Sequence, residues 1–314
     1  MVNSGNRRDW TFESVAGPFP GNMGGVAWDG QAVLFSLPEA MLIKRFDPAT
    51  GVTSDLRKYT GRANGLAVAR DGSIYAAQEG GRRVIQYMPD GSAKVTGLRI
   101  AGAVHNHPCD LVVDSRERVW FSDPHHGVHA FGPQVFPPLD HASVLRLERD
   151  ERRAWQIRRV TFDTTVPRAV LLSADEKTLY ISEGDTARTS VRELRAYPVR
   201  TDGTVGPYEV LHTFGRDHQG AHRGIEGLCL DENGCVIACG GGRDAGPGPM
   251  IYVFSPSGRL LETHVFPGDA PVRCAFGGAA LDELFVSSTD GRLYRAREPG
   301  RRGHNLASPT RESQ

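Results

Sequence analysis

The amino-acid sequence predicts an all-β protein, a six-bladed β-propeller with four-stranded antiparallel blades, on the basis of three observations. Short apolar runs alternate with turns rich in glycine and proline, which number 37 and 20 among the 314 residues. One unit, an apolar strand, a tight turn and a second apolar strand, recurs at intervals of about 40 to 60 residues. No long window shows the periodicity of an amphipathic helix.

The repeated units begin near residues 24, 64, 109, 168, 225 and 272. In the second unit, residues 64–68 form the first apolar run and residues 74–77 form the next. Six such sheets closed into a ring bury their faces against one another and leave only short edges. We therefore expect one propeller domain over residues 11–300, with flexible termini at residues 1–10 and 301–314. A β-sandwich with some helices is the alternative fold.

Charge and composition narrow the class of partner. Lys plus Arg and Asp plus Glu each total 37, and this balance argues against a nucleic-acid or anionic-membrane surface. No apolar run reaches about 18 residues, so no membrane span is expected. The N-terminal residues are polar and five cysteines are present, which favours a cytoplasmic protein with free thiols. A small molecule is the expected partner, and the sequence leaves the oligomeric state open.

Three segments carry a resemblance to a known family: Ala63-Asn64-Gly65-Leu66-Ala67-Val68, residues 106–114 from Asn106 to Asp114, and residues 173–180 from Ser173 to Tyr180. In their order and spacing they resemble the gluconolactonases and senescence-marker-30-like proteins, and the similarity extends from about residue 11 to 298. The resemblance implies a propeller whose central pocket holds a divalent metal on one Glu, two Asn and one Asp. It also implies hydrolysis of a lactone or similar ester by water that the metal activates.

The sequence departs from this family at the implied metal ligands. The matching positions are Gly24, Cys109, Arg168 and Glu226. Glycine offers no side-chain ligand, and arginine is a permanent cation without an acceptor lone pair. We therefore expect no metal cofactor, with Arg168 replacing the metal's charge and pairing with Glu226. The alternative is a soft divalent ion such as zinc, held by Cys109 with His107 or His105 and Glu226.

Three residues are candidates for catalysis. Glu226 is expected to act as a general acid or base, or to serve only as an ion-pair partner for Arg168 or Arg273. Cys109 is either a nucleophile, its pKa lowered from about 8.5 by Arg168, or a small side chain that fills the channel. Arg168 is expected to stabilise a developing oxyanion.

A second group of residues is expected to bind the substrate. Arg273 suits an anionic oxygen on the substrate, or a structural ion pair with Glu226 or Asp110. By the resemblance, Asn64 and Glu79 match positions that line the pocket or support it, with turn or interblade hydrogen bonds as the alternative. The remaining candidates are the histidines His107, His125 and His126.

Together these observations predict a metal-independent hydrolase that acts on a small lactone or cyclic ester in the central channel. Two alternatives remain open at this stage. One is a lyase, isomerase or condensation enzyme that uses Glu226 as acid or base, as the similarity to strictosidine-synthase-like propellers implies. The other is a small-molecule binder without catalytic activity.

Overall fold

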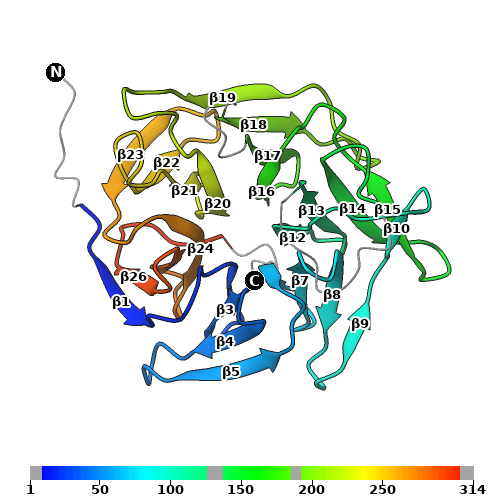
Figure 1. The fold of residues 1–314 in the computed structure, drawn as a ribbon, viewed down its shortest axis with the longest axis horizontal. Helices are drawn as coiled ribbons and strands as arrows, with labels where there is room; N and C mark the ends of the chain where they lie inside the picture. Colours follow the sequence, from blue (N-terminus) through cyan, green and yellow to red (C-terminus); the bar gives the residue numbers. More distant parts are fainter. Residues whose placement is uncertain (1–8, 126–136, 185–191, 305–314) are drawn as a thin grey trace, which may run out of the picture.

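The structure, a computed structural model, describes residues 9–125, 137–184 and 192–304. Within these residues, six four-stranded antiparallel sheets are arranged in a ring, and no helix is present (Figure 1). The predicted six-bladed propeller is confirmed, and the sandwich alternative is wrong. None of the described segments is a helix long and apolar enough to cross a membrane.

The first three blades follow the chain order, each from its innermost to its outermost strand. Blade 1 consists of β2 (Val26–Trp28), β3 (Val33–Leu37), β4 (Leu42–Phe46) and β5 (Thr53–Lys58). Blade 2 consists of β6 (Ala63–Val68), β7 (Ile74–Gln78), β8 (Arg83–Tyr87) and β9 (Ala93–Val95). Blade 3 consists of β12 (Leu111–Val113), β13 (Val119–Asp123), β14 (Ser143–Arg149) and β15 (Trp155–Arg159). A small hairpin of β10 (Arg99–Ile100) and β11 (Ala103–Val104) precedes blade 3.

The last three blades complete the ring. Blade 4 consists of β16 (Pro167–Leu172), β17 (Thr178–Glu183), β18 (Arg192–Pro198) and β19 (Glu209–Phe214). Blade 5 consists of β20 (Ile225–Leu230), β21 (Val236–Gly240), β22 (Met250–Phe254) and β23 (Leu260–Val265). Blade 6 consists of β24 (Pro271–Gly277), β25 (Glu283–Ser288) and β26 (Leu293–Arg297), and its outermost strand is β1 (Phe12–Ala16) from the other end of the chain.

Strand β1 closes the ring, because it pairs antiparallel with β26 and joins the two ends of the chain in one sheet (Figure 1). Trp10, directly before β1, is buried and its ring stacks on His264 with 4.1 Å between the ring centroids. At the other end, Arg301 lies 2.5 Å from carboxylate oxygens of both Asp231 and Glu262. The remainder of the predicted flexible termini, residues 1–8 and 305–314, lies outside the described residues.

The hydrophobic core lies between adjacent blades. Between blades 3 and 4, for example, Trp120, Leu179 and Tyr197 are almost fully buried in one cluster. Burying a side chain of this size contributes about 1.5–3 kcal/mol, so the ring is stabilised mainly at these interfaces.

At the axis the blades approach so closely that glycine is required. A Cβ atom on Gly65 would lie 2.7 Å from the Cα atom of Asp110 in blade 3. A Cβ atom on Gly227 would lie 2.7 Å from the Cα atom of Arg273 in blade 6. The residue before each of these glycines, Asn64 or Glu226, therefore stands where the inner strands converge on the axis.

Candidate functional site

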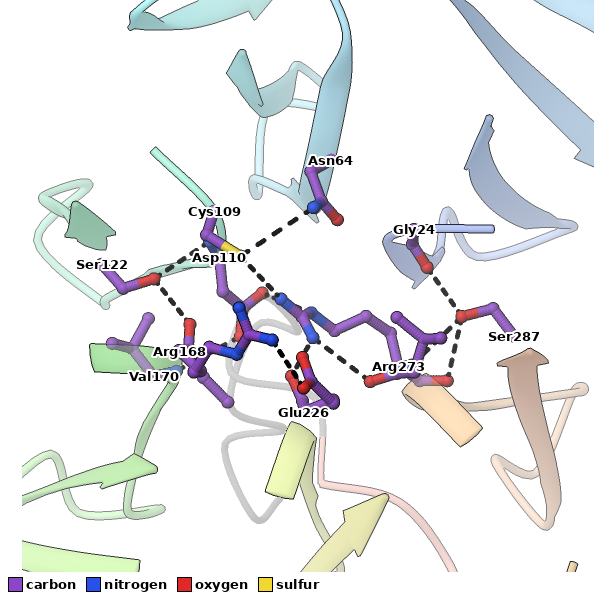
Figure 2. Close-up of polar contacts among 12 residues, drawn as sticks. Gly24, Asn64, Cys109, Asp110, Ser122, Arg168, Val170, Glu226, Arg273 and Ser287 are labelled. Atoms are coloured by element: carbon purple, nitrogen blue, oxygen red, sulfur yellow. Dashed lines mark hydrogen bonds and ion pairs between the residues drawn. The ribbon is translucent and has the colours of Figure 1, made fainter. Parts of the chain in front are cut away.

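One pocket of about 250 Å³ lies on the propeller axis and gathers residues from the inner strands of several blades. Six of the residues that the sequence identifies line this pocket: Asn64, Glu79, Cys109, Arg168, Glu226 and Arg273. They come from blades 2 to 6, and Figure 2 shows five of them pointing toward the centre of the ring. The structure thus brings most of the predicted site together.

Arg168 and Glu226 form the ion pair that the sequence predicts. Nη2 of Arg168 lies 2.8 Å from Oε1 of Glu226, and both side chains are largely buried. Nε of Arg223 lies 3.6 Å from the same oxygen. Burial alone would raise the pKa of Glu226, but the guanidiniums of Arg168, Arg223 and Arg273 lower it to about 2. Glu226 is therefore a carboxylate at neutral pH.

Arg273 provides a second cation at the hub. Its side chain reaches across the axis, where Nη2 donates to Sγ of Cys109 at 3.3 Å (Figure 2). Nε lies 3.3 Å from Oδ1 of Asp110, and Nη1 donates to the backbone carbonyl of Glu226. The sequence assigns the replacement of the metal's charge to Arg168 alone, whereas the structure places two guanidiniums at the hub.

Cys109 is a buried thiol in the pocket. Burial raises its pKa to about 12, and the nearby guanidinium of Arg273 offsets only part of this effect. Arg168 does lower this pKa, as expected, but the predicted net lowering is wrong, because desolvation of the thiolate outweighs the attraction of both arginines. The thiol form of Cys109 accepts a hydrogen bond from Arg273 and is poorly suited to nucleophilic attack.

Glu79 is a carboxyl group that lines the pocket and differs from Glu226 in the direction of its pKa shift. Burial raises its pKa, although a hydrogen bond from Asn64 and the charge of Arg62 act in the opposite direction. Nδ2 of Asn64 lies 2.5 Å from Oε1 of Glu79. A buried carboxyl group that lines a pocket and has a raised pKa is suited to accept and return a proton.

The histidines do not join the pocket that the described residues form. His105 and His107 are buried, and burial lowers the pKa of each to about 4, so both are neutral at neutral pH. His125 is exposed. Neither His107 nor His125, both predicted to bind substrate, is among the lining residues. The third predicted histidine, His126, lies outside the described residues.

The residues present do not fit a divalent metal at the position that the resemblance implies. A Cβ atom on Gly24 would lie 2.5 Å from Oγ of Ser36 and 2.7 Å from Oδ1 of Asn64, so a carboxylate side chain has no room there. Arg168 directs its guanidinium at the carboxylate of Glu226, where a dication would be repelled. Across the described ranges, no three His, Cys, Asp or Glu side chains are grouped to hold an ion.

Two arginines that line the pocket, Arg62 and Arg223, were missed by the sequence reasoning. Strand periodicity gave no signal for Arg62, because its φ of 57° is not an extended conformation and the pairing of β6 with β7 shifts register between Ala63 and Leu66. No such signal existed for Arg223, because the pairing of β20 with β21 shifts register between Ile225 and Gly227. The periodicity of the strand therefore does not extend back to Arg223.

The fold and the site define a six-bladed propeller with a central pocket lined by arginines and carboxyl groups. The chain belongs to the SMP-30/Gluconolactonase/LRE-like region family, whose model matches residues 24–290. This finding confirms the family resemblance seen in the sequence.

Individual relatives point the same way. The chain is 27% identical over 284 residues to a gluconolactonase of Zymomonas mobilis subsp. mobilis, with 84% of this chain and 75% of the relative covered. It is 25% identical over 253 residues to a 6-deoxy-6-sulfogluconolactonase of Pseudomonas putida, with 79% and 75% covered. Among solved structures, a gluconolactonase from Xanthomonas campestris superposes with a TM-score of 0.74 at 25% identity, covering 92% of this chain and 89% of that one.

Proposed function

We propose that the protein is a lactone hydrolase that acts in the central pocket without a divalent metal. The observation that carries this proposal is the pair of buried guanidiniums, Arg168 and Arg273, which meet at the hub beside Glu226. They provide the positive charge that the resemblance assigns to a divalent metal, because the residues at the implied ligand positions of this chain do not fit such an ion. The gluconolactonase relatives support the reaction class.

Hydrolysis needs a base for water and a stabiliser for the oxyanion. The Glu79 carboxylate removes a proton from water, and the resulting hydroxide adds to the lactone carbonyl carbon. Arg168, which lines the pocket, stabilises the negative charge that develops on the carbonyl oxygen. When the ring C–O bond breaks, the proton on Glu79 passes to the departing ring oxygen, and the product is an open hydroxy acid.

Glu226 and Cys109 take supporting roles in this mechanism. The low pKa of Glu226 makes it a weak base, so we assign proton transfer to Glu79 and give Glu226 the task of holding Arg168 in place. Cys109 contacts Arg273 as a neutral thiol and helps to position that guanidinium.

Hydrolysis of D-glucono-1,4-lactone and D-glucono-1,5-lactone, followed in a pH-stat with and without EDTA, tests the proposal. We expect turnover that EDTA leaves unchanged and that Glu79→Gln abolishes. Glu232→Gln, which changes an exposed carboxylate outside the pocket, is the matched control and should retain full activity. A stoichiometric divalent ion in the purified protein, together with loss of turnover in EDTA, would contradict metal independence.

Two further measurements separate the alternative functions, which are a lyase or isomerase and a non-catalytic binder. Exchange of solvent deuterium into a bound oxo acid, without lactone turnover, would favour proton-transfer chemistry of the lyase or isomerase kind. Binding of lactones without any reaction would favour a non-catalytic binder.

A further inference from the structure

Two arginines in the pocket have no part in the proposed mechanism and keep buried nitrogen atoms without an acceptor. Among the described residues, Nε of Arg62 and Nη1 of Arg223 have no hydrogen-bond partner. Both side chains line the central pocket. A buried charged donor that lacks an acceptor is costly, so both nitrogens are suited to an acceptor that a ligand brings.

The charges around Arg223 are not balanced. Arg168 and Arg223 face the same oxygen of Glu226, at 2.8 and 3.6 Å, so two guanidiniums share one carboxylate. Arg273 has its own partner, Asp110, at 3.3 Å. Burial raises the pKa of Asp110, and the charge of Arg273 lowers it. Among the described residues, Arg223 therefore has only the carboxylate of Glu226, which it shares with Arg168, as an ion-pair partner.

Arg62 lies on the opposite side of the pocket. It precedes blade 2, whereas Arg223 precedes blade 5, and these blades stand across the axis in a ring of six (Figure 1). The backbone of Arg62 has a φ of 57°, a left-handed conformation that costs a non-glycine residue free energy. Gly80 leaves room for the side chain of Arg62, because a Cβ atom at residue 80 would lie only 3.0 Å from Cδ of Arg62.

We propose, on the basis of the hydrolase function above, that the substrate is a small lactone bearing an acidic substituent, which Arg223 binds. A carboxylate, phosphate or sulfonate supplies Arg223 with a negative charge of its own and Nη1 with an acceptor. The pocket, with a volume of about 250 Å³, has room for one small ring with one acidic group. Arg62 contacts the ring from the other side, next to Glu79.

Matched lactones test this specificity. D-Glucaro-1,4-lactone and D-glucono-1,4-lactone share one ring and differ in a carboxylate against a hydroxymethyl group. The second pair, 6-phospho-D-glucono-1,5-lactone and D-glucono-1,5-lactone, examines phosphate in the same way. We expect kcat/KM to be at least about tenfold higher for an acidic lactone than for its neutral partner. The pair with the larger ratio identifies which acid the pocket accepts.

Variants assign the preference to Arg223. Arg223→Gln should lower the acidic-to-neutral ratio of kcat/KM by about tenfold, chiefly through KM, and Arg223→Lys should retain part of the preference. Arg259→Gln, which changes an exposed arginine of the same blade, should leave the ratio as it is in the parent protein. Equal kcat/KM for both members of each pair would overturn the acidic-substrate proposal and leave the hydrolase function standing.

Calorimetric binding of D-glucarate, which has no lactone bond to cleave, keeps the inference separate from catalysis. If no lactone is hydrolysed, the proposed function fails, but tenfold weaker D-glucarate binding by Arg223→Gln still supports an anion site at Arg223. Undetectable binding, or equal binding by parent and variant, overturns it. A thermal melt of each variant confirms folding, and Arg223→Lys supplies the comparison if the glutamine variant does not fold.

Discussion

Glu226→Gln tests whether the hub depends on its buried carboxylate. The substitution keeps the size of the side chain and removes the charge that Arg168 and Arg223 share. Burial acts to raise the pKa of Glu226, yet the arginines lower it from the ordinary 4.5 to about 2. Each pH unit between these two values corresponds to about 1.4 kcal/mol, so the ionised carboxylate contributes about 3 kcal/mol to folding at pH 7.

The pH dependence of this contribution has a definite sign. Because the pKa of Glu226 is lower in the folded state, the stabilisation is complete above pH 4.5 and is lost as the pH falls toward 2. Urea unfolding followed by tryptophan fluorescence should show Glu226→Gln less stable by about 3 kcal/mol at pH 7 and by about half of that at pH 3. Glu39→Gln, which alters an exposed carboxylate, is the control. A loss below about 1 kcal/mol at pH 7, or equal losses at both pH values, would refute this reasoning.

Three further predictions concern the thiol, the base and the ring closure. Cys109→Ser should keep lactone turnover within about threefold, because the thiol is neutral and a hydroxyl also accepts from Arg273; complete loss would restore the nucleophile hypothesis. The kcat/KM of the parent protein should fall on the acid side with a pKa above 4.5, since protonated Glu79 takes no proton from water, and a profile flat down to pH 4 would argue against this base. Trp10→Ala should lower the free energy of unfolding, measured in urea, by about 3–5 kcal/mol, because Trp10 is buried against His264. Tyr59→Ala, at a residue that is 88% exposed, should change the free energy of unfolding little. Equal effects of the two variants would contradict the role of Trp10 in ring closure.

The ion pair of Arg168 and Glu226 was predictable because it depends on repeat positions. Each residue stands at the start of an inner strand, and equivalent positions of neighbouring blades meet at the axis of a propeller. The place of Asn64 near the axis was predictable for the same reason. Strand β1 was harder to foresee, because nothing local in residues 12–16 shows that they complete a sheet formed by the opposite end of the chain.

The properties of Cys109 and Glu79 were not predictable in the same way. A pKa depends on how much water the whole ring excludes, and this exclusion is the sum of contributions from all blades. The resemblance implied that Arg168 lies near Cys109 and left a thiolate nucleophile and a channel-filling side chain as alternatives, whereas burial produces a neutral thiol. The histidines illustrate the same point, because His107 is close to Cys109 in the chain and does not line the pocket.

The sequence by itself determined the repeat and the number of blades, because these follow from residue type and spacing along the chain, and its motifs carried the resemblance to the family. Only the tertiary structure decided that Arg273 reaches across to Cys109, that Arg223 shares the carboxylate of Glu226, and that burial raises the pKa of Glu79. The physical reason is that charge and desolvation act through space, between side chains that come from different blades and meet only when the ring is closed.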